Sequence, residues 1–169
     1  MELRKDLDYN KVAYLPLTRD LVVYFDRDMF SQVARYRWCA CHCRKGRYYA
    51  ERKKPGNVYV LLHQEILRKK EGYVCDHKNN DTMDNRRSNL HLVPRWYNAF
   101  NRTQKVSGYY KKHGKWIARV QFKGQSIRLG RFDNKQEAIS TARHFRKKLM
   151  ATYLKSEEYK RVNQRRKIK

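Results

Sequence analysis

The sequence predicts a modular α+β fold made of several small units, and three observations support it. Hydrophobic residues make up 40% of the 169 residues, which is thin for one large core. Strand-like stretches dominate the first third of the chain, whereas the clearest helix signal begins near residue 135. The net charge of +25 is also uneven: residues 1–60 hold 13 basic and 7 acidic side chains, residues 61–106 hold 9 and 5, and residues 107–169 hold 19 and 4. The predicted units are an N-terminal β-rich region (1–60), a central hairpin-and-helix motif (61–106), a three-stranded antiparallel sheet packed on one helix (107–154) and a basic tail (155–169).

The excess of positive charge indicates a polyanionic partner, and nucleic acid is the simplest one. A basic ribosome-associated or membrane-surface protein would share this charge. No apolar run approaches the roughly 20 residues of a spanning helix, so no membrane span is expected. The first ten residues are charged and mixed in sign, which predicts a cytoplasmic, reducing environment in which the four cysteines are thiols.

The N-terminal region reads as a small antiparallel sheet. The stretches VAYLPLT and LVVYF predict two strands, and CACHC and YYAER predict two more around a Lys45-Gly46 turn. Between these pairs, apolar residues from Met29 to Tyr36 recur at helical spacing, with Asp26 or Asp28 as the cap. The next stretch, VYVLLHQEIL, predicts a strand that turns helical at its end.

Three cysteines of this region share one strand face by alternation. Cys39, Cys41 and Cys43, with His42 nearby, invite a zinc interpretation, but zinc sites usually use cysteine pairs at longer spacings on turns. Ordinary thiols are therefore the favoured interpretation. Four histidines have no visible acid–base partner and are predicted to be surface or packing residues: His42, His91, His113 and His144.

The densest polar cluster, VCDHKNNDTMDNRRSNLHLVPRWYNAFN, predicts a strand, a loop, a second strand and a helix. The first strand ends at Asp76-His77, the second covers residues 90–93, and Pro94 suits the first turn of a helix carrying Asn98. Such a hairpin packed on a helix brings Asp76 opposite Asn98. Trp96, Tyr97 and Phe100 then face elsewhere and form core.

These residues offer the chemistry of phosphodiester hydrolysis. His77 suits a general base because an unperturbed imidazole, with a pKa of about 6.5, is largely neutral at physiological pH. Asp76 and Asn98 offer hard oxygen ligands, which fit Mg²⁺ or Mn²⁺ better than zinc, and this small set favours a single metal. Asn89 has amide groups that can bond across the loop and fix the His77 segment.

With these spacings the sequence resembles the HNH, or ββα-metal, endonucleases of the phage and intron homing type. The pattern runs from Asp76-His77 through Asn89, twelve positions after His77, to Asn98, nine positions further. The resemblance implies that Asp76 and Asn98 hold the metal, that His77 is the general base and that Asn89 is structural. These phage relatives usually have Arg where this chain has Gln64. His63 is predicted to support the site or touch phosphate, or to be an ordinary structural histidine.

The C-terminal stretch predicts a sheet and a helix. KWIARVQF and SIRL read as strands joined by a turn at Lys123-Gly124, and one more strand is possible at residues 109–111. Asn134 is predicted to cap a helix from Lys135, with Glu137 three positions on as in a capping box. The apolar side of this helix repeats at four positions, which are Ala138, Ala142, Phe145 and Leu149. Beyond Lys155 no apolar stripe is visible, which predicts a frayed tail.

Alternation divides the predicted sheet into two faces. One set points to the helix (Trp116, Ala118, Val120, Ile127, Leu129), and the other stays open (Arg119, Gln121, Ser126, Arg128). The open face suits the major groove of DNA, where Arg pairs with guanine and Gln with adenine; the alternative is an ordinary solvated face. Residues 107–150 resemble the Apetala-type DNA-binding domain through Gly114-Lys115-Trp116, Leu129-Gly130-Arg131-Phe132 and the alanine-rich helix. The predicted DNA contacts are Lys111, Lys112, Trp116, Arg119, Gln121, Ser126, Arg128 and Arg131, with His63 in the nuclease.

Together these features predict a sequence-directed DNA endonuclease of the homing type, acting on double-stranded DNA as a monomer or homodimer. The resemblance places it in a phage-infected bacterial cell and implies 5′-phosphate and 3′-hydroxyl products. Two alternatives are a non-catalytic DNA-binding regulator with a degenerate nuclease fold and an RNA-binding basic protein. A fragment ending near Arg102 is expected to keep its nuclease chemistry and lose most of its DNA affinity.

Overall fold

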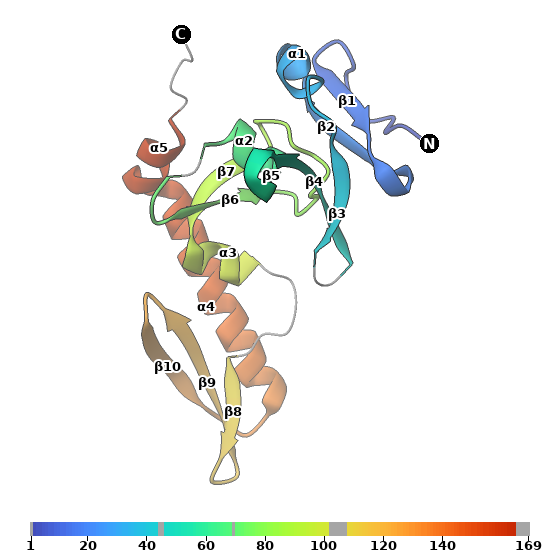
Figure 1. The fold of residues 1–169 in the computed structure, drawn as a ribbon. Helices are drawn as coiled ribbons and strands as arrows, with labels where there is room; N and C mark the ends of the chain where they lie inside the picture. Colours follow the sequence, from blue (N-terminus) through green and yellow to red (C-terminus); the bar gives the residue numbers. More distant parts are fainter. Residues whose placement is uncertain (1, 44–45, 69, 102–107, 165–169) are drawn as a thin grey trace. The chain divides into compact units, whose positions relative to one another are not determined.

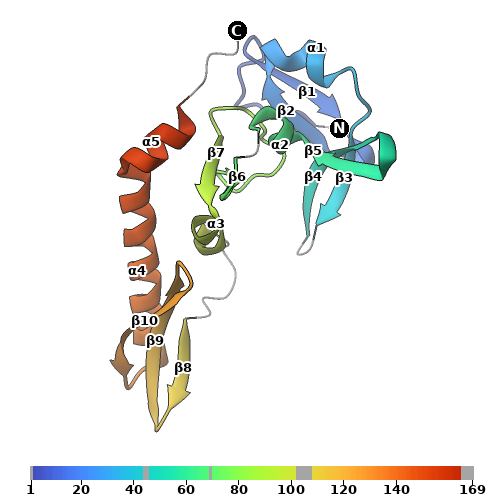
Figure 2. The same ribbon diagram turned by 60° about the vertical axis from the view of Figure 1, so that its left-hand side comes forward.

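A computed structural model describes residues 2–43, 46–68, 70–101 and 108–164 of the chain (Figures 1 and 2). It combines helices with several small sheets and divides the chain into two compact units, residues 1–93 and 94–169. The predicted boundaries at residues 60 and 106 stay predictions. Among the described residues, no helix has both the length and the apolar character needed to cross a membrane.

The first unit contains three small sheets. In the first sheet, β1 (Val12–Pro16) pairs antiparallel with β2 (Val22–Asp26). In the second, β4 (Arg47–Lys54) pairs with both β3 (Cys39–Cys43) and β5 (Val58–Leu61). In the third, β6 (Tyr73–His77) pairs with β7 (Leu90–Pro94). Short helices connect them: α1 (Phe30–Val33), α2 (Leu62–Ile66) and the 3-10 turns Thr18–Asp20, Arg27–Met29 and Pro55–Asn57. The predicted single N-terminal sheet is therefore two separate sheets, and the predicted turn at residue 45 lies outside the described residues.

β2 is the central strand of this unit because both of its faces are covered. Val23 and Phe25, both 0% exposed, join one apolar cluster, whereas Val22 and Tyr24 join another. A strand covered on both sides needs an unbroken apolar run, which LVVYF supplies. The first cluster continues across α1, β3, β4 and α2 through Met29, Val33, Trp38, Ala40, Ala50 and Leu62.

Two local predictions for this unit are corrected by the structure. Neither Asp26 nor Asp28 caps the helical turn that follows β2; their carboxylates instead accept hydrogen bonds from Arg87. Pro94 is the last residue of β7, and the helix begins one residue later. A capping carboxylate and one that binds a distant arginine carry the same local sequence signal, so only the fold distinguishes them.

The second unit begins with α3 (Arg95–Asn101) and continues with a three-stranded antiparallel sheet in the order β10-β9-β8. Its strands are β8 (Tyr109–Lys112), β9 (Lys115–Phe122) and β10 (Gln125–Phe132). α4 (Lys135–Lys155) packs on this sheet, with Ala138 and Ala142 completely buried. Asn134 caps α4 as predicted, since its Oδ1 accepts a hydrogen bond from the Gln136 N–H at 2.7 Å.

The prediction of a frayed tail after Lys155 is wrong for residues 157–163, which form α5 (Glu157–Asn163). Ser156 caps this helix by accepting a hydrogen bond from the Tyr159 N–H at 3.2 Å, and two glutamates occupy its first turn. Val162 is 8% exposed and the Tyr159 ring packs against Tyr153. The cap signal was present in the sequence, but the helix has too few apolar residues to show a stripe.

Candidate functional site

The loop between β6 and β7, residues 78–89, follows directly from Asp76 and His77. Its Asn and Asp side chains fold it into two successive Asx turns: Asn79 Oδ1 accepts from the Asp81 N–H at 2.9 Å, and Asp81 Oδ1 accepts from the Met83 N–H at 3.0 Å. Asn80, between them, has a positive φ of 63°, which asparagine tolerates. The polar run that looks like a flexible loop in the sequence is therefore a defined structure.

Asn89 joins the two ends of this loop. Its Nδ2 donates to the Asp84 carbonyl at 2.8 Å, and its Oδ1 accepts from the Asn79 N–H at 3.1 Å. Its backbone carbonyl also accepts from the Lys78 N–H at 2.9 Å, next to His77. The hydrogen bonds across the loop that the sequence suggested for Asn89 are thus present, and they fix the chain immediately after the predicted general base.

Asp84 is the buried anchor of the loop. Its carboxylate is 0% exposed and accepts two hydrogen bonds from the Arg86 guanidinium, both at 2.7 Å, and one from Asn79 Nδ2 at 3.1 Å. Burial alone would raise the pKa of Asp84, but the hydrogen bond and charge of Arg86 hold it below its usual value. Asp84 therefore remains an anion that organises the surrounding chain.

Two sheets of the first unit hold the same loop through their backbone N–H and carbonyl groups. The Tyr24 N–H donates to the Met83 carbonyl at 2.8 Å, and the Asn85 N–H donates to the Tyr24 carbonyl at 2.7 Å, so Tyr24 forms a parallel bridge with Asp84. Thr82 Oγ1 donates to the Tyr48 carbonyl at 2.5 Å. Ion pairs extend the attachment: Arg87 with Asp26 and Asp28, and Arg4 with Asp81. The β1-β2 sheet and the β3-β4-β5 sheet therefore hold the loop between β6 and β7 in place.

This clamp predicts a large effect of Asp84→Ala on stability. Removing a buried carboxylate that is paired and hydrogen-bonded is expected to lower the free energy of unfolding by about 3–5 kcal/mol, measured by urea denaturation. Asp28→Ala is the matched control, since Asp28 pairs with Arg87 of the same loop but its side chain is 65% exposed. The control should cost less than about 1 kcal/mol. Equal losses for both variants would show that Asp84 is not the anchor.

His77 lies in a cluster of rings at the end of β6. The residue is 4% exposed, and the centroid of its ring is 5.0 Å from that of His63 on α2 and 6.2 Å from that of Tyr49 on β4. Burial lowers the pKa of His77, which outweighs the opposing effects of Asn85 and nearby carboxylates. The neutral imidazole that a general base requires is therefore favoured. His63 is itself 5% exposed, which fits support of the His77 ring better than a phosphate contact.

Asp76 is half-buried beside β7, and its Oδ2 lies 3.9 Å from Nε2 of His91. From its sequence context His91 is predicted to be a packing or surface residue, and no local pattern predicts a role for Tyr49, Asp84 or Asn85. Along β7, alternation places His91 on the opposite face of the strand from Leu90 and Leu92. This alternation was the sequence signal that His91 has different neighbours from these leucines. Pairing of β7 with β6 then brings it to Asp76.

A divalent cation fits the donor chemistry of the predicted ligands. Asp76 offers a carboxylate and Asn98 an amide oxygen, and Mg²⁺ binds through one or two such groups while keeping several waters. No cluster of three or more His, Cys, Asp or Glu side chains suited to a metal occurs among residues 2–43, 46–68, 70–101 and 108–164. No disulfide joins the cysteines in this part of the chain.

Asn98 lies on α3, which belongs to the second unit. There Trp96 packs edge-on against Phe122, with ring centroids 4.9 Å apart, and against Tyr153 at 5.4 Å, while Tyr97 is 5% exposed. The predicted core role of the α3 aromatic residues is thus confirmed within this unit. Because the two units are described separately, the pairing of Asn98 with Asp76 stays a prediction.

The open face of the second unit's sheet gathers most of the predicted DNA contacts. Arg128 pairs with Arg119 and Ser126 with Gln121, so these four exposed side chains share one face, as alternation predicted. The Arg119 guanidinium lies 5.2 Å from the centroid of the Tyr110 ring. Trp116 and Lys111 pair with each other on the other face, where the Lys111 ammonium lies 5.7 Å from the indole. The structure therefore separates these two residues from the open-face group.

A β-bulge explains how Arg131 joins the open face. The register shifts between Arg128 and Gly130, so Gly130 pairs with Ala118 and Arg131 with Ile117. Simple alternation would place Arg131 opposite to Arg128, but the extra residue reverses the phase. Gly130 has a φ of 157°, which a side-chain-bearing residue rarely adopts, and this requirement accounts for the glycine in the Leu-Gly-Arg-Phe sequence.

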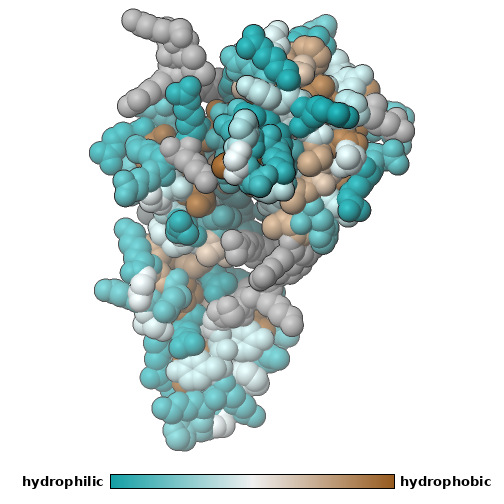
Figure 3. Space-filling model, in the orientation of Figure 1, coloured by the Kyte–Doolittle hydropathy of each residue, from teal (hydrophilic) through white to brown (hydrophobic). Residues whose placement is uncertain are grey.

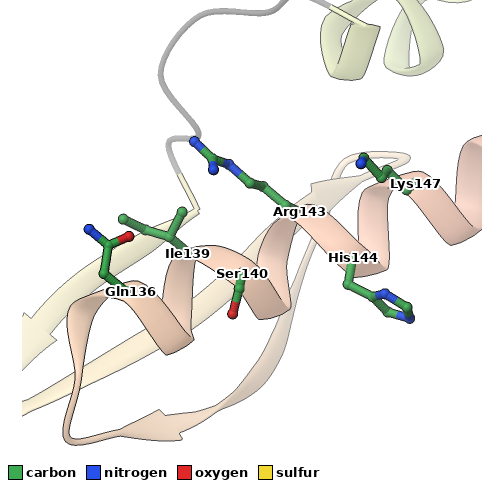
Figure 4. A pocket seen from close by; sticks show the side chains of 6 residues that line it. All are labelled: Gln136, Ile139, Ser140, Arg143, His144 and Lys147. Carbon is green, nitrogen blue, oxygen red and sulfur yellow. The ribbon is translucent and has the colours of Figure 1, made fainter.

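A surface hollow on α4 is separate from the open face of the sheet. Hydrophilic residues cover most of the visible surface of both units (Figure 3). The hollow in Figure 4 is formed by side chains of α4 alone and includes none of the predicted site residues. Its lining residues are Gln136, Ile139, Ser140, Arg143, His144 and Lys147.

Comparison with known families gives a match over the middle of the chain. A model of the family described as HNH endonuclease matches residues 68–100, which include β6, the clamped loop, β7 and most of α3. The matched segment is about a fifth of the chain and contains Asp76, His77, Asn89 and Asn98. No curated protein and no solved structure matches the chain. The match supports a nuclease that acts on DNA.

Proposed function

We propose that the protein is a sequence-directed, metal-dependent HNH endonuclease that hydrolyses a phosphodiester of double-stranded DNA. The observation that carries the proposal is the Asp76-His77 pair at the end of β6, followed by a loop that Asn89, Asp84 and the N-terminal sheet hold rigidly. The Asp76-His77 pair and the loop lie inside the segment that the family model matches. Hydrolysis needs the metal ligand and the general base in fixed positions, because catalytic groups must be preorganised.

The proposed chemistry assigns one role to each group of side chains. Asp76 and Asn98 hold a single Mg²⁺ or Mn²⁺, which supplies positive charge to the phosphorane and to the leaving oxygen. Neutral His77 takes a proton from the attacking water, and its burial favours that neutral form. Asn89 holds the chain after His77, and the His63 and Tyr49 rings pack beside its imidazole. The resemblance to homing nucleases adds 5′-phosphate and 3′-hydroxyl ends and action in a phage-infected bacterial cell.

DNA reading is proposed for the open face of β8-β9-β10. Arg119, Gln121 and Arg128 are exposed on one face while α4 covers the other, so base contacts there need no refolding. Lys112 and Arg131 extend the same face with positive charge for phosphates. A single active site per chain cuts one strand, so a monomer is expected to nick and two cuts require a homodimer or two successive events.

Single substitutions on this face separate base reading from phosphate binding. Arg128→Ala is expected to relax preference at one or two base pairs, at about 1–3 kcal/mol of discrimination. Lys112→Ala should instead weaken all sequences alike and lower the log–log salt slope by about one. Both side chains are exposed, so neither change should affect folding. The measurement is binding of a site library at two salt concentrations. Uniform weakening by Arg128→Ala would make Arg128 a phosphate contact.

The decisive experiment for the proposed function is cleavage of plasmid DNA with Mg²⁺ and with excess chelator. Nicked or linear product that depends on Mg²⁺ and is absent with Asp76→Ala supports the nuclease. Tight DNA binding without cleavage under any divalent metal would instead identify a regulator with a degenerate nuclease fold. Preference for RNA over DNA of the same sequence would favour the RNA-binding alternative.

A further inference from the structure

Asn85, a residue without a role in the proposed mechanism, is held rigidly inside the catalytic loop. It is 1% exposed, and its N–H donates to the Tyr24 carbonyl at 2.7 Å. Two residues earlier, the Met83 carbonyl accepts from the Tyr24 N–H at 2.8 Å. The backbone of Asn85 is thus held between Asp84, which Arg86 anchors, and strand β2.

The orientation of the Asn85 amide follows from its hydrogen bond. Nδ2 donates to the Thr82 carbonyl at 3.1 Å, an atom that only accepts, so the amide cannot be turned the other way. Oδ1 therefore points away from Thr82. This oxygen is buried and, among the described residues, has no partner with ordinary hydrogen-bond geometry. A buried acceptor without a donor is destabilising, so a donor is expected close by.

His77 also has a ring nitrogen that lacks a hydrogen-bond partner within the residues that the structure describes. Its Nε2 is also buried without a partner of ordinary geometry in the described part of the chain. Hydrogen bonds of Asn89 bring the two residues together: its carbonyl accepts from the Lys78 N–H, next to His77, and its Nδ2 donates to the Asp84 carbonyl, next to Asn85. In line with this placement, hydrogen bonding by Asn85 acts to raise the pKa of His77, against the larger lowering by burial. An amide oxygen favours the protonated imidazole only by accepting from a ring N–H. One unmet acceptor and one unmet ring nitrogen therefore adjoin each other within the same loop.

We propose that Asn85 is a positioning residue for the general base, with its Oδ1 accepting a hydrogen bond from the Nε2–H of His77. The proposal rests on the proposed function, in which His77 takes a proton from water. A neutral imidazole carries one ring proton, so fixing that proton on Nε2 leaves the lone pair on Nδ1. Nδ1 is then the atom that accepts the proton of water, and the resulting imidazolium keeps its bond to Oδ1.

In this assignment, the hydrogen bonds between β2 and the loop help to orient the general base. Tyr24 fixes the backbone of Asn85, Thr82 fixes its amide, and Asn85 fixes the ring of His77. The orientation of the base thereby depends in part on Tyr24, more than fifty positions earlier in the chain. Partners that orient a functional histidine through its second nitrogen typically contribute 10–100-fold to activity in metal sites.

Two variants isolate the oxygen acceptor. Asn85→Leu and Asn85→Asp both lose the Nδ2 donor to Thr82, but only Asn85→Asp keeps an oxygen facing His77. Asn85→Leu is expected to slow single-turnover cleavage roughly 10–100-fold, with DNA affinity and Mg²⁺ dependence unchanged, and Asn85→Asp should recover much of that loss. Asn79→Ala is the control for general loosening of the loop, because Asn79 bonds Asp84 and Asp81 but not His77.

A spectroscopic readout tests the hydrogen bond without DNA or metal. In ¹⁵N-histidine-labelled full-length protein at neutral pH, we expect the His77 proton on Nε2, as a downfield resonance in slow exchange with water. The resonance should persist in Asn85→Asp and Asn79→Ala and should be lost in Asn85→Leu. A proton on Nδ1 in the wild type overturns the proposal, and so does an unchanged Nε2 proton in Asn85→Leu. The wild-type spectrum decides the matter even if a variant fails to fold. The expected resonance in a protein that cuts no DNA would leave the Asn85 contact standing and remove only the proposed function.

Discussion

Replacement of His77 with alanine is expected to slow DNA cleavage by about 10²–10⁴-fold, the usual loss when a general base is removed. DNA affinity should stay nearly unchanged, because the proposed reading face lies on β9 and β10 of the second unit. The measurement is single-turnover cleavage at saturating DNA, together with binding in the presence of Ca²⁺.

His42→Ala is the matched control for the His77 substitution. His42 belongs to the same unit and is also a strand histidine, but it is exposed, and its ring packs edge-on against Tyr48 with centroids 5.0 Å apart. It should cut at the wild-type rate. Equal loss of cleavage and binding in a folded His77→Ala protein would contradict the division of labour between the two units.

Truncation after residue 101 is expected to abolish cleavage even at saturating DNA. The sequence alone suggested that a fragment ending near Arg102 would keep its nuclease chemistry. The packing of α3 supports the opposite expectation, because its Trp96 and Tyr97 rings pack against Phe122 and Tyr153, which the fragment lacks. A seven-residue helix without its packing partners is not stable in water, so Asn98 would lose its fixed position.

Loss of affinity must be separated from loss of chemistry in this experiment. The full-length Arg119→Ala, Arg128→Ala double variant serves as the control, since it weakens DNA binding but keeps the packing of α3. At saturating DNA the double variant should cut at the wild-type rate, whereas the fragment should not. A fragment that reaches the full-length rate once saturated would show that α3 folds without the rest of the second unit.

Local patterns in the sequence predicted those parts of the fold whose causes are local. The strands around residues 74–77 and 90–93, the Asn134 cap and the two faces of β9 follow from spacing, capping chemistry and alternation. The spacing of Asp76, His77, Asn89 and Asn98 likewise identified the segment that matches the nuclease family. Each of these signals lies within about 25 residues of chain.

Contacts between distant segments could not be predicted in this way. Asp26 was assigned to cap a neighbouring helical turn, yet it binds Arg87, 61 positions away. Tyr24 has an ordinary strand sequence, and nothing local shows that its backbone holds Met83 and Asn85. Arg131 needed knowledge of the bulge at Gly130 before its face could be assigned. Contacts between distant segments decided the first two cases, and the register of β10 on β9 decided the third.

The position of α3 limits how this protein can be re-engineered. The segment that matches the nuclease family ends on a helix that folds with the second unit, so the boundary at residues 93 and 94 passes through the motif. A chimera joined at that boundary would separate Asn98 from the aromatic residues that hold its helix. Retargeting should therefore exchange side chains at positions 119, 121, 126 and 128 within the native chain and leave the cleavage module and its junction intact.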